Sequence, residues 1–109
     1  MGARVHLMYG LAGSGKSTLA RELSRQGGAV RFTLDEWMLR LHPELGIDDA
    51  EYGHRAEQVR EVIWVTAEQV LAAGVDVVLD WNSWSRQRRS WAIERAEGQG
   101  AEVVLHWLG

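Results

Sequence analysis

Hydrophobic residues recur along this chain with two different periods. Short apolar runs, typical of buried strands, are separated by longer stretches in which apolar residues recur every three or four positions, as on one face of a helix. Gly27-Gly28 and Gly74 end two of these helical stretches, and His42-Pro43 ends a third, since the residue before a proline disfavours the helical region. The pattern predicts strands at residues 5–9, 30–34, 75–79 and 101–108, and helices at residues 16–26, 36–41, 50–73 and 86–97.

The predicted elements alternate between strand and helix from one end of the chain to the other. Strands joined by helical crossovers form a parallel sheet with right-handed connections and helices on both faces. The run 75–79 is almost entirely apolar, which is typical of a central strand covered on both sides. No repeat, low-complexity tract or linker interrupts the pattern. We therefore expect one α/β domain over residues 1–109, built as a three-layer sandwich.

A glycine-rich loop follows the first predicted strand directly. Residues 10–17 match the Walker A pattern G-x-x-x-x-G-K-[ST], between a strand and a helix. The glycines let successive N–H groups point inward around an anion, and the following helix adds the positive end of its dipole. We predict that this loop binds the phosphates of a nucleoside triphosphate through Leu11, Ala12, Gly13, Ser14, Gly15, Lys16, Ser17 and Thr18.

Lys16 is the only lysine of a chain that contains eleven arginines. Arginine and lysine are not interchangeable at a site that needs a compact point charge. In a Walker A loop the lysine reaches the β- and γ-phosphates, and the hydroxyl of the next residue, here Ser17, lies in the Mg²⁺ shell. The alternative, a plain glycine-rich turn, requires neither the lysine nor the hydroxyl. The loop therefore favours nucleotide binding.

Two aspartates follow other predicted strands, at the carboxyl edge of the sheet where folds of this kind bind ligands. Asp35 is a candidate carboxylate of the site, and a plain N-cap of helix 36–41 is the alternative; the two roles are compatible. Asp80 follows an apolar strand, where a carboxylate either serves a metal or phosphate site or needs a costly partner. Both aspartates are therefore candidates for the chemistry around a bound nucleotide.

The loop, Asp35 and segment 77–82 resemble the small P-loop kinases of the AAA_33, zeta-toxin and polynucleotide-kinase group, over residues 5–108. The resemblance implies the strand order 2-3-1-4 and the use of ATP and Mg²⁺. It also implies that Asp35 binds the acceptor hydroxyl and acts as its base, and that Asp80 lies near the Mg²⁺ and the phosphates. The implied catalytic residues are Lys16, Asp35 and Asp80, and the implied metal ligands are Ser17 and Asp80.

Acceptor-binding residues are less clearly marked. Relatives often have an arginine three residues after the acceptor aspartate; Met38 stands there, and Arg40 is the nearest arginine. Arginines in the first turn of a helix oppose its dipole, which indicates either a nearby anion or ordinary solvated side chains. Asn82 either orients a substrate or shapes a turn. The candidate acceptor residues are Arg40, Asn82, Arg86 and Arg89, with Arg88 beside them.

The sequence also departs from these kinases at the end of the chain. Relatives continue past the fourth strand into an arginine-bearing lid, a fifth strand and a loop that holds the base, whereas this sequence stops at Gly109. It thus resembles the N-terminal portion of such a kinase, without lid arginines to stabilise the transition state. Strand 101–108 would then be an apolar sheet edge, and we expect self-association through it.

Composition and single residues limit the other functions. A net charge of −3 disfavours general nucleic-acid binding, and no apolar run reaches the roughly 20 residues of a membrane span. The lack of cysteine excludes disulfides but does not fix the compartment. We see no signal-peptide pattern, and a cytoplasmic location is the default, which suits a protein that uses intracellular ATP. His6 and His106 lie in apolar strands and are expected to be core residues. The six tryptophans are expected to be packing residues, although Trp37 or Trp81 could stack on a base or sugar.

The leading interpretation is phosphoryl transfer from Mg-ATP to a hydroxyl of a small molecule or nucleotide. A nucleotide- or phosphate-binding module without transfer is the first alternative, because a lid is lacking. A polynucleotide 5′-hydroxyl kinase is the second, since Arg86, Arg88 and Arg89 could form a local basic patch. The sequence does not name the acceptor or separate ATP from GTP.

Overall fold

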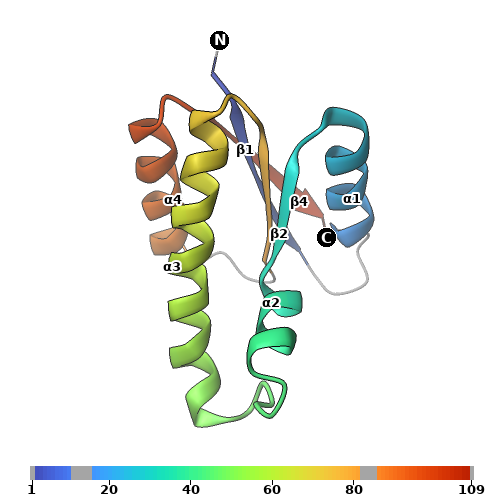
Figure 1. Cartoon of the computed structure of the whole chain (residues 1–109), viewed down its shortest axis with the longest axis vertical. Coiled ribbons are helices and arrows are strands. Elements are labelled where there is room, and N and C mark those ends of the chain that lie inside the picture. The colour runs from blue at the N-terminus through green and yellow to red at the C-terminus, as the bar shows by residue number, and fades with distance from the viewer. Residues whose placement is uncertain (1, 11–15, 82–85, 109) are drawn as a thin grey trace.

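The computed structural model describes residues 2–10, 16–81 and 86–108, and its helices and strands follow the predicted order (Figure 1). Every element begins and ends within two residues of its predicted bounds. The strands are β1 (Arg4–Gly10), β2 (Val30–Thr33), β3 (Val77–Asp80) and β4 (Glu102–Leu108). The helices are α1 (Lys16–Gly27), α2 (Leu34–Leu41), α3 (Ala50–Ala72) and α4 (Arg86–Gly98).

The four strands form one parallel sheet in the order β2-β3-β1-β4, which confirms the predicted topology. Helix α1 covers one face, and α3 and α4 lie side by side on the other (Figure 1). All carboxyl ends of parallel strands meet at one edge of the sheet. Beyond that edge lie α2 and the first half of α3, so these two helices flank the expected ligand side (Figure 1).

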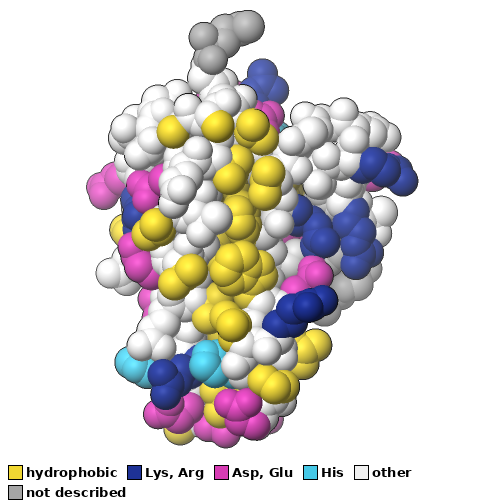
Figure 2. All heavy atoms as spheres, viewed as in Figure 1, with side chains coloured by type: hydrophobic (Ala, Val, Ile, Leu, Met, Phe, Trp, Pro, Cys, Tyr) yellow, Lys and Arg dark blue, Asp and Glu magenta, His cyan; other side chains and the backbone are white. Residues whose placement is uncertain are grey.

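The main core lies between the sheet and the α3–α4 layer. Every residue of β3 is buried, as its apolar run predicts for a central strand. Hydrophobic side chains continue along the seam between α3 and the β2–α2 segment (Figure 2). Trp64 meets Trp91 edge to face across the two helices, with ring centroids 5.5 Å apart. Arg95 lies over both rings and binds Glu61 and Glu68, which ties α4 to α3.

The junction between β2 and α2 differs from its prediction. Helix α2 begins at Leu34, and its N-cap is Thr33, whose side chain makes no capping hydrogen bond. The interpretation of Asp35 as an N-cap is therefore wrong, because Asp35 is the second residue of the helix. The early start has a packing reason: Leu34 and Met38, four residues apart, are both buried on the same face of α2.

Strand β4 pairs with β1 along its whole length, and no strand of the described residues pairs with its other side. The side chain of Leu105 is 44% exposed there. Unpaired strand edges are templates for pairing with another chain, so self-association through β4 stays a prediction. None of the helices described is long and apolar enough to cross a lipid bilayer.

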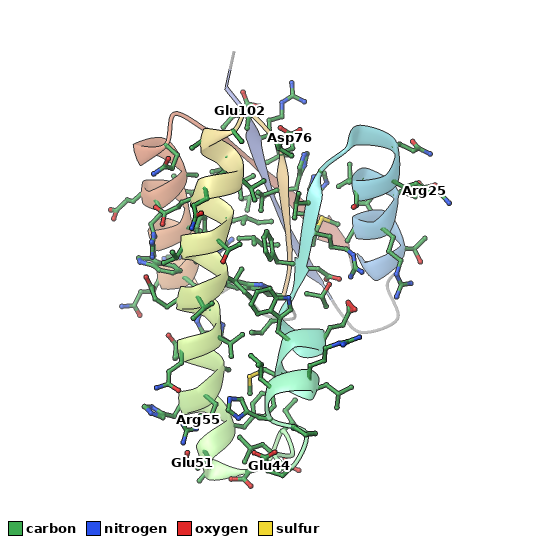
Figure 3. The ribbon with its side chains drawn as sticks, in the orientation of Figure 1. Arg25, Glu44, Glu51, Arg55, Asp76 and Glu102 are labelled. Atoms are coloured by element: carbon green, nitrogen blue, oxygen red, sulfur yellow. The ribbon has the colours of Figure 1, made fainter. Side chains whose placement is uncertain are left out.

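Two histidines face each other between β1 and β4, as expected for histidines within apolar strands. Nδ1 of His6 lies 2.9 Å from Nε2 of His106, and His6 is buried. Burial, together with the charges of His106 and Arg4, lowers the pKa of His6, while Asp76 opposes that shift. Asp76 lies near Glu102 at the amino edge of the sheet (Figure 3). Burial also lowers the pKa of His106.

These lowered pKa values predict a loss of stability in mild acid. Below the ordinary histidine pKa of 6.5, the unfolded chain binds more protons at these sites than the folded chain. The free energy of unfolding should therefore be fully retained above pH 6.5 and fall as the pH drops through the folded pKa values. Urea unfolding between pH 8 and pH 5 measures this fall. His6→Gln should flatten the profile, and His54→Gln, at an exposed position, should not; equal slopes in all three proteins would contradict the assignment.

Candidate functional site

The Walker A loop has the structural setting that its sequence predicts. β1 ends at Gly10 at the carboxyl edge of the sheet, and α1 begins at Lys16. Ser17 and Thr18 follow in the first turn of α1, so the amino end of that helix faces the strand ends. The loop residues between them, Leu11, Ala12, Gly13, Ser14 and Gly15, lie outside the described residues.

Asp80 is the last residue of β3 and occupies the middle of the carboxyl edge. It is paired in register with Met8 of β1 on one side and with Thr33 of β2 on the other. Its side chain is buried, with 1% of the residue exposed. A carboxylate placed so deeply costs free energy unless it is bound by other groups. The structure thus puts an acidic group one strand away from the end of β1, where the loop begins.

Asp35 lies on the same edge, one strand further out. It is exposed in the first turn of α2, two residues after Thr33, the register partner of Asp80. Burial raises the pKa of Tyr52 on α3, and the charge of Asp35 raises it further. The charge of Asp35 on α2 therefore acts on a side chain of α3. The two aspartates singled out from the sequence belong to one edge of the sheet.

Arg31 fixes the segment that carries Asp35. Its guanidinium donates to the hydroxyl of Thr33 at 2.5 Å and to Oε2 of Glu36 at 2.7 Å. The hydrogen bond from Arg31 lowers the pKa of Glu36, so Glu36 stays ionised and bound. The turn from β2 into α2 is thus bridged by side chains on both sides of Asp35.

The candidate acceptor arginines do not meet in one place. Arg40 lines a small hollow of about 280 Å³ on α2, with Glu36, Trp37 and Leu41. The arginines of α4 lie elsewhere: Arg86 is exposed, Arg89 is half-buried, and Arg88 donates to Glu57 of α3 at 2.8 Å. Asn82 lies outside the described residues. Arg40 and the α4 arginines therefore belong to separate surfaces in this structure.

The tryptophans that the structure describes pack as predicted. The alternative that Trp81 stacks on a base or sugar is wrong. Trp81 is 1% exposed and belongs to the main core, so it has no open face for a base or sugar. Trp37 is half-buried and packs against Phe32, with ring centroids 5.9 Å apart. Both side chains pack in the apolar seam under α2 and α3, because burying an aromatic ring lowers the free energy relative to leaving it in water.

Three residues of α3 on this side of the molecule were not among the residues singled out from the sequence: Tyr52, Glu57 and Arg60. For Tyr52 and Arg60 the signal was a four-residue spacing. Tyr52, Ala56, Arg60 and Trp64 follow one another on one stripe of the helix, and both Ala56 and Trp64 are buried. An arginine between two core positions on the same stripe must direct its guanidinium over the apolar surface, which singles it out from the solvated arginines.

The strand order, the strand–loop–helix setting of the Walker A sequence and the aspartate at the end of β3 define a P-loop NTPase domain of the kinase-like class. The chain belongs to the AAA_33 family, described as an AAA domain, which matches residues 5–109. A search among curated proteins finds no match.

Solved structures share the fold. The APS kinase CysC of Mycobacterium tuberculosis, as its Cys556Ala mutant, is 24% identical with a TM-score of 0.68, over 98% of this chain and 76% of that one. A chain of the Pnkp1/Rnl/Hen1 complex is 19% identical with a TM-score of 0.81, over 99% of this chain and 36% of that one. The hexameric APS kinase of Thiobacillus denitrificans is 27% identical with a TM-score of 0.62, over 99% and 22%. This chain therefore spans well under half the length of the last two.

Proposed function

We propose that this chain binds Mg-ATP at its Walker A loop and transfers the γ-phosphoryl group to a hydroxyl of a small molecule or nucleotide. The observation that carries the proposal is the buried Asp80, which lies next to β1, the strand that precedes the Walker A loop. Kinases of this fold among the similar structures, the two APS kinases included, support the reaction class. Lys16 and the loop amides would neutralise the charge of the β- and γ-phosphates.

The oxygen donors on this edge suit Mg²⁺. Mg²⁺ is typically held by one or two protein oxygens, substrate phosphates and water, so a large carboxylate cage is not needed. The described residues contain no group of three or more histidine or carboxylate side chains placed to hold a metal. Ser17, next to the loop, and the buried carboxylate of Asp80 would hold the ion. A bound Mg²⁺ would supply charge neutralisation at the transferring phosphoryl group.

Asp35 is the residue proposed to hold the acceptor. It is exposed and lies on the same edge as Asp80, so a hydroxyl can approach it from solvent. Its carboxylate would accept the hydroxyl proton as the oxygen attacks the γ-phosphorus. The Arg31 bridge to Thr33 and Glu36 would keep Asp35 at a constant position relative to the sheet edge.

Calorimetry with Mg-ATP and Mg-GTP tests the first step of this proposal on the wild-type protein. We expect saturable binding of one nucleotide per chain, followed by phosphoryl transfer in a screen of hydroxyl-bearing compounds. Binding without transfer to any acceptor would favour a nucleotide-binding module that does no chemistry. If neither nucleotide binds, the proposal fails for this chain.

A polynucleotide 5′-hydroxyl kinase is a second candidate, and one surface favours it. Arg21, Arg25 and Arg31 line a hollow of about 480 Å³ between α1 and β2. Basic side chains also gather on the α1 side of the face seen in Figure 2. A single-stranded oligonucleotide titrated over a salt series separates the two candidates, because contacts to phosphates weaken steeply as salt rises.

A further inference from the structure

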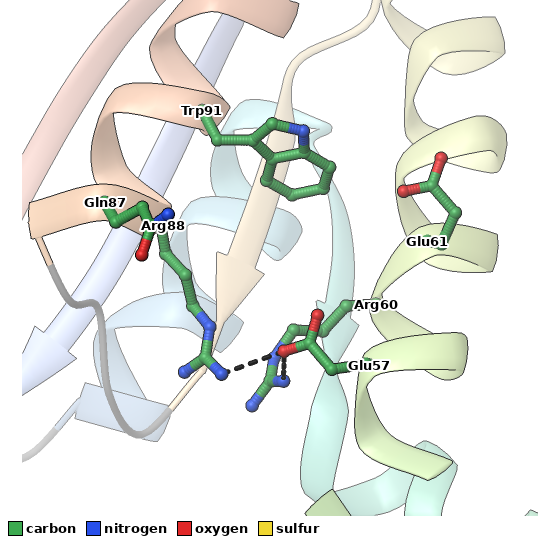
Figure 4. Close-up of a pocket in the computed structure, with 6 residues that line it drawn as sticks. All are labelled: Glu57, Arg60, Glu61, Gln87, Arg88 and Trp91. Carbon is green, nitrogen blue, oxygen red and sulfur yellow. Dashed lines mark hydrogen bonds and ion pairs between the residues drawn. The ribbon is translucent and has the colours of Figure 1, made fainter. Parts of the chain in front are cut away.

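A pocket lies between α3 and α4. Its volume is about 500 Å³, and the described residues that line it come from these two helices (Figure 4). They are Glu57, Arg60, Glu61, Gln87, Arg88 and Trp91. A pocket of this size accommodates a small molecule.

Two arginines of the pocket share a single carboxylate oxygen. Oε1 of Glu57 accepts from Arg60 at 2.6 Å and from Arg88 at 2.8 Å, as the dashed lines of Figure 4 show. The other acidic residue of the wall, Glu61, is bound by Arg95 at 2.8 Å. Two guanidinium groups thus converge on one carboxylate oxygen at the centre of the pocket.

Arg60 is the deeper of the two arginines. Only 13% of its side chain is exposed, compared with 35% for Arg88. Its guanidinium lies 5.7 Å from the ring centre of Trp81, the residue that follows β3. Burial lowers the pKa of Arg60, and the charge of Arg88 lowers it further. Within the described residues the Nε of Arg60 is buried without a hydrogen-bond acceptor.

Tyr52 of α3 lies within reach of charges from both α2 and the pocket. Tyr52 lies one helical turn before Ala56 and two turns before Arg60 on the same stripe of α3. The charges of both Asp35 and Arg60 act on the Tyr52 hydroxyl. Trp81 places the arginine pair next to the end of β3, on the edge that carries Asp80.

We propose that the Arg60–Arg88 pair binds a doubly charged oxyanion, the phosphate or sulfate ester group of a small acceptor, and that Glu57 occupies its place in the free protein. Two guanidinium groups present a forked set of donors that suits a tetrahedral oxyanion. Glu57 is 61% exposed, so its side chain can turn outward without becoming buried elsewhere. That the bound oxyanion belongs to an acceptor rests on the proposed phosphoryl transfer. That the arginine pair binds an oxyanion does not.

Inorganic phosphate is the probe, and Lys16→Ala is the background, since that variant should weaken phosphate binding by the Walker A loop. Calorimetry should show saturable binding of phosphate and sulfate to Lys16→Ala, with acetate much weaker because it carries one charge. Adding Arg88→Gln should weaken phosphate about tenfold or more, the effect of one charge-assisted hydrogen bond. Adding Glu57→Gln should tighten it by a similar factor, because the internal competitor loses its charge.

Arg55→Gln is the matched control, because Arg55 lies on α3 and binds Glu51 and Gln58 of its own helix (Figure 3). It should leave phosphate affinity unchanged. Arg88→Gln keeps the Glu57–Arg60 pair, so the fold should survive, as thermal unfolding would verify. Equal phosphate affinity with and without Arg88, or acetate binding as tight as phosphate, would overturn the inference. If the wild-type protein fails to bind Mg-ATP but phosphate still binds at the arginine pair, the oxyanion site stands and the proposed phosphoryl transfer does not.

Discussion

Replacing Lys16 with alanine should lower the affinity for Mg-ATP by about two orders of magnitude or more. Lys16 opens α1 directly after the loop, at the carboxyl edge of the sheet. Truncating one partner of a desolvated charge pair costs roughly 2–5 kcal/mol, and about 1.4 kcal/mol corresponds to tenfold in affinity. The loop amides and the helix dipole would remain, but they act on the same phosphates without the point charge. Calorimetry with Mg-ATP on the wild type and the variant measures the loss.

Two further variants separate the role of Lys16 from a general effect of charge. Arg25→Ala removes a positive charge from the same helix, at a side chain that is 77% exposed, and should leave the affinity close to wild type. Lys16→Arg keeps the charge but replaces the compact ammonium by a planar fork, and it should still bind poorly. If Arg25→Ala and Lys16→Ala weakened binding equally, the loop would have no special part in it.

The arrangement of the elements could be predicted from the sequence because each one has a local signal. β3 is an unbroken apolar run, and glycines follow α1 and α3 where these helices end. The order of strands came from the resemblance to P-loop kinases and is confirmed. The start of α2 could not be predicted from the local sequence. It depends on the burial of Leu34 where α2 packs on α3, which is a tertiary contact.

In the candidate site, too, some residues could be predicted from the sequence and others could not. Asp35 and Asp80 could be found because a strand end is visible in the pattern, and the register places them on one edge. The α3–α4 pocket could not, because its two arginines come from positions 28 residues apart and converge only when the helices pack. Arg88 was noticed for its place in the first turn of a helix, but its partner Glu57 has no sequence signal of its own.

Replacing Asp35 with asparagine should abolish phosphoryl transfer while leaving the affinity for Mg-ATP nearly intact. Asparagine has almost the same shape as aspartate but cannot accept the proton of the attacking hydroxyl. General-base catalysis contributes about 10²–10⁴-fold to a rate, so the turnover number should fall by that factor. Asp35 is exposed, which means that the substitution leaves no buried group without a partner. Transfer assays with an identified acceptor and calorimetry with Mg-ATP measure the two quantities separately.

Glu36→Gln is the matched control for Asp35→Asn, because it removes the neighbouring carboxylate charge and keeps an oxygen to accept from Arg31. Transfer by this variant should remain close to that of the wild type. A parallel fall in transfer and in nucleotide affinity for Asp35→Asn would refute the assignment of Asp35 as base and indicate a structural part in the nucleotide site. A fall in transfer alone, absent from Glu36→Gln, locates the proton acceptor at the edge of the sheet where α2 begins.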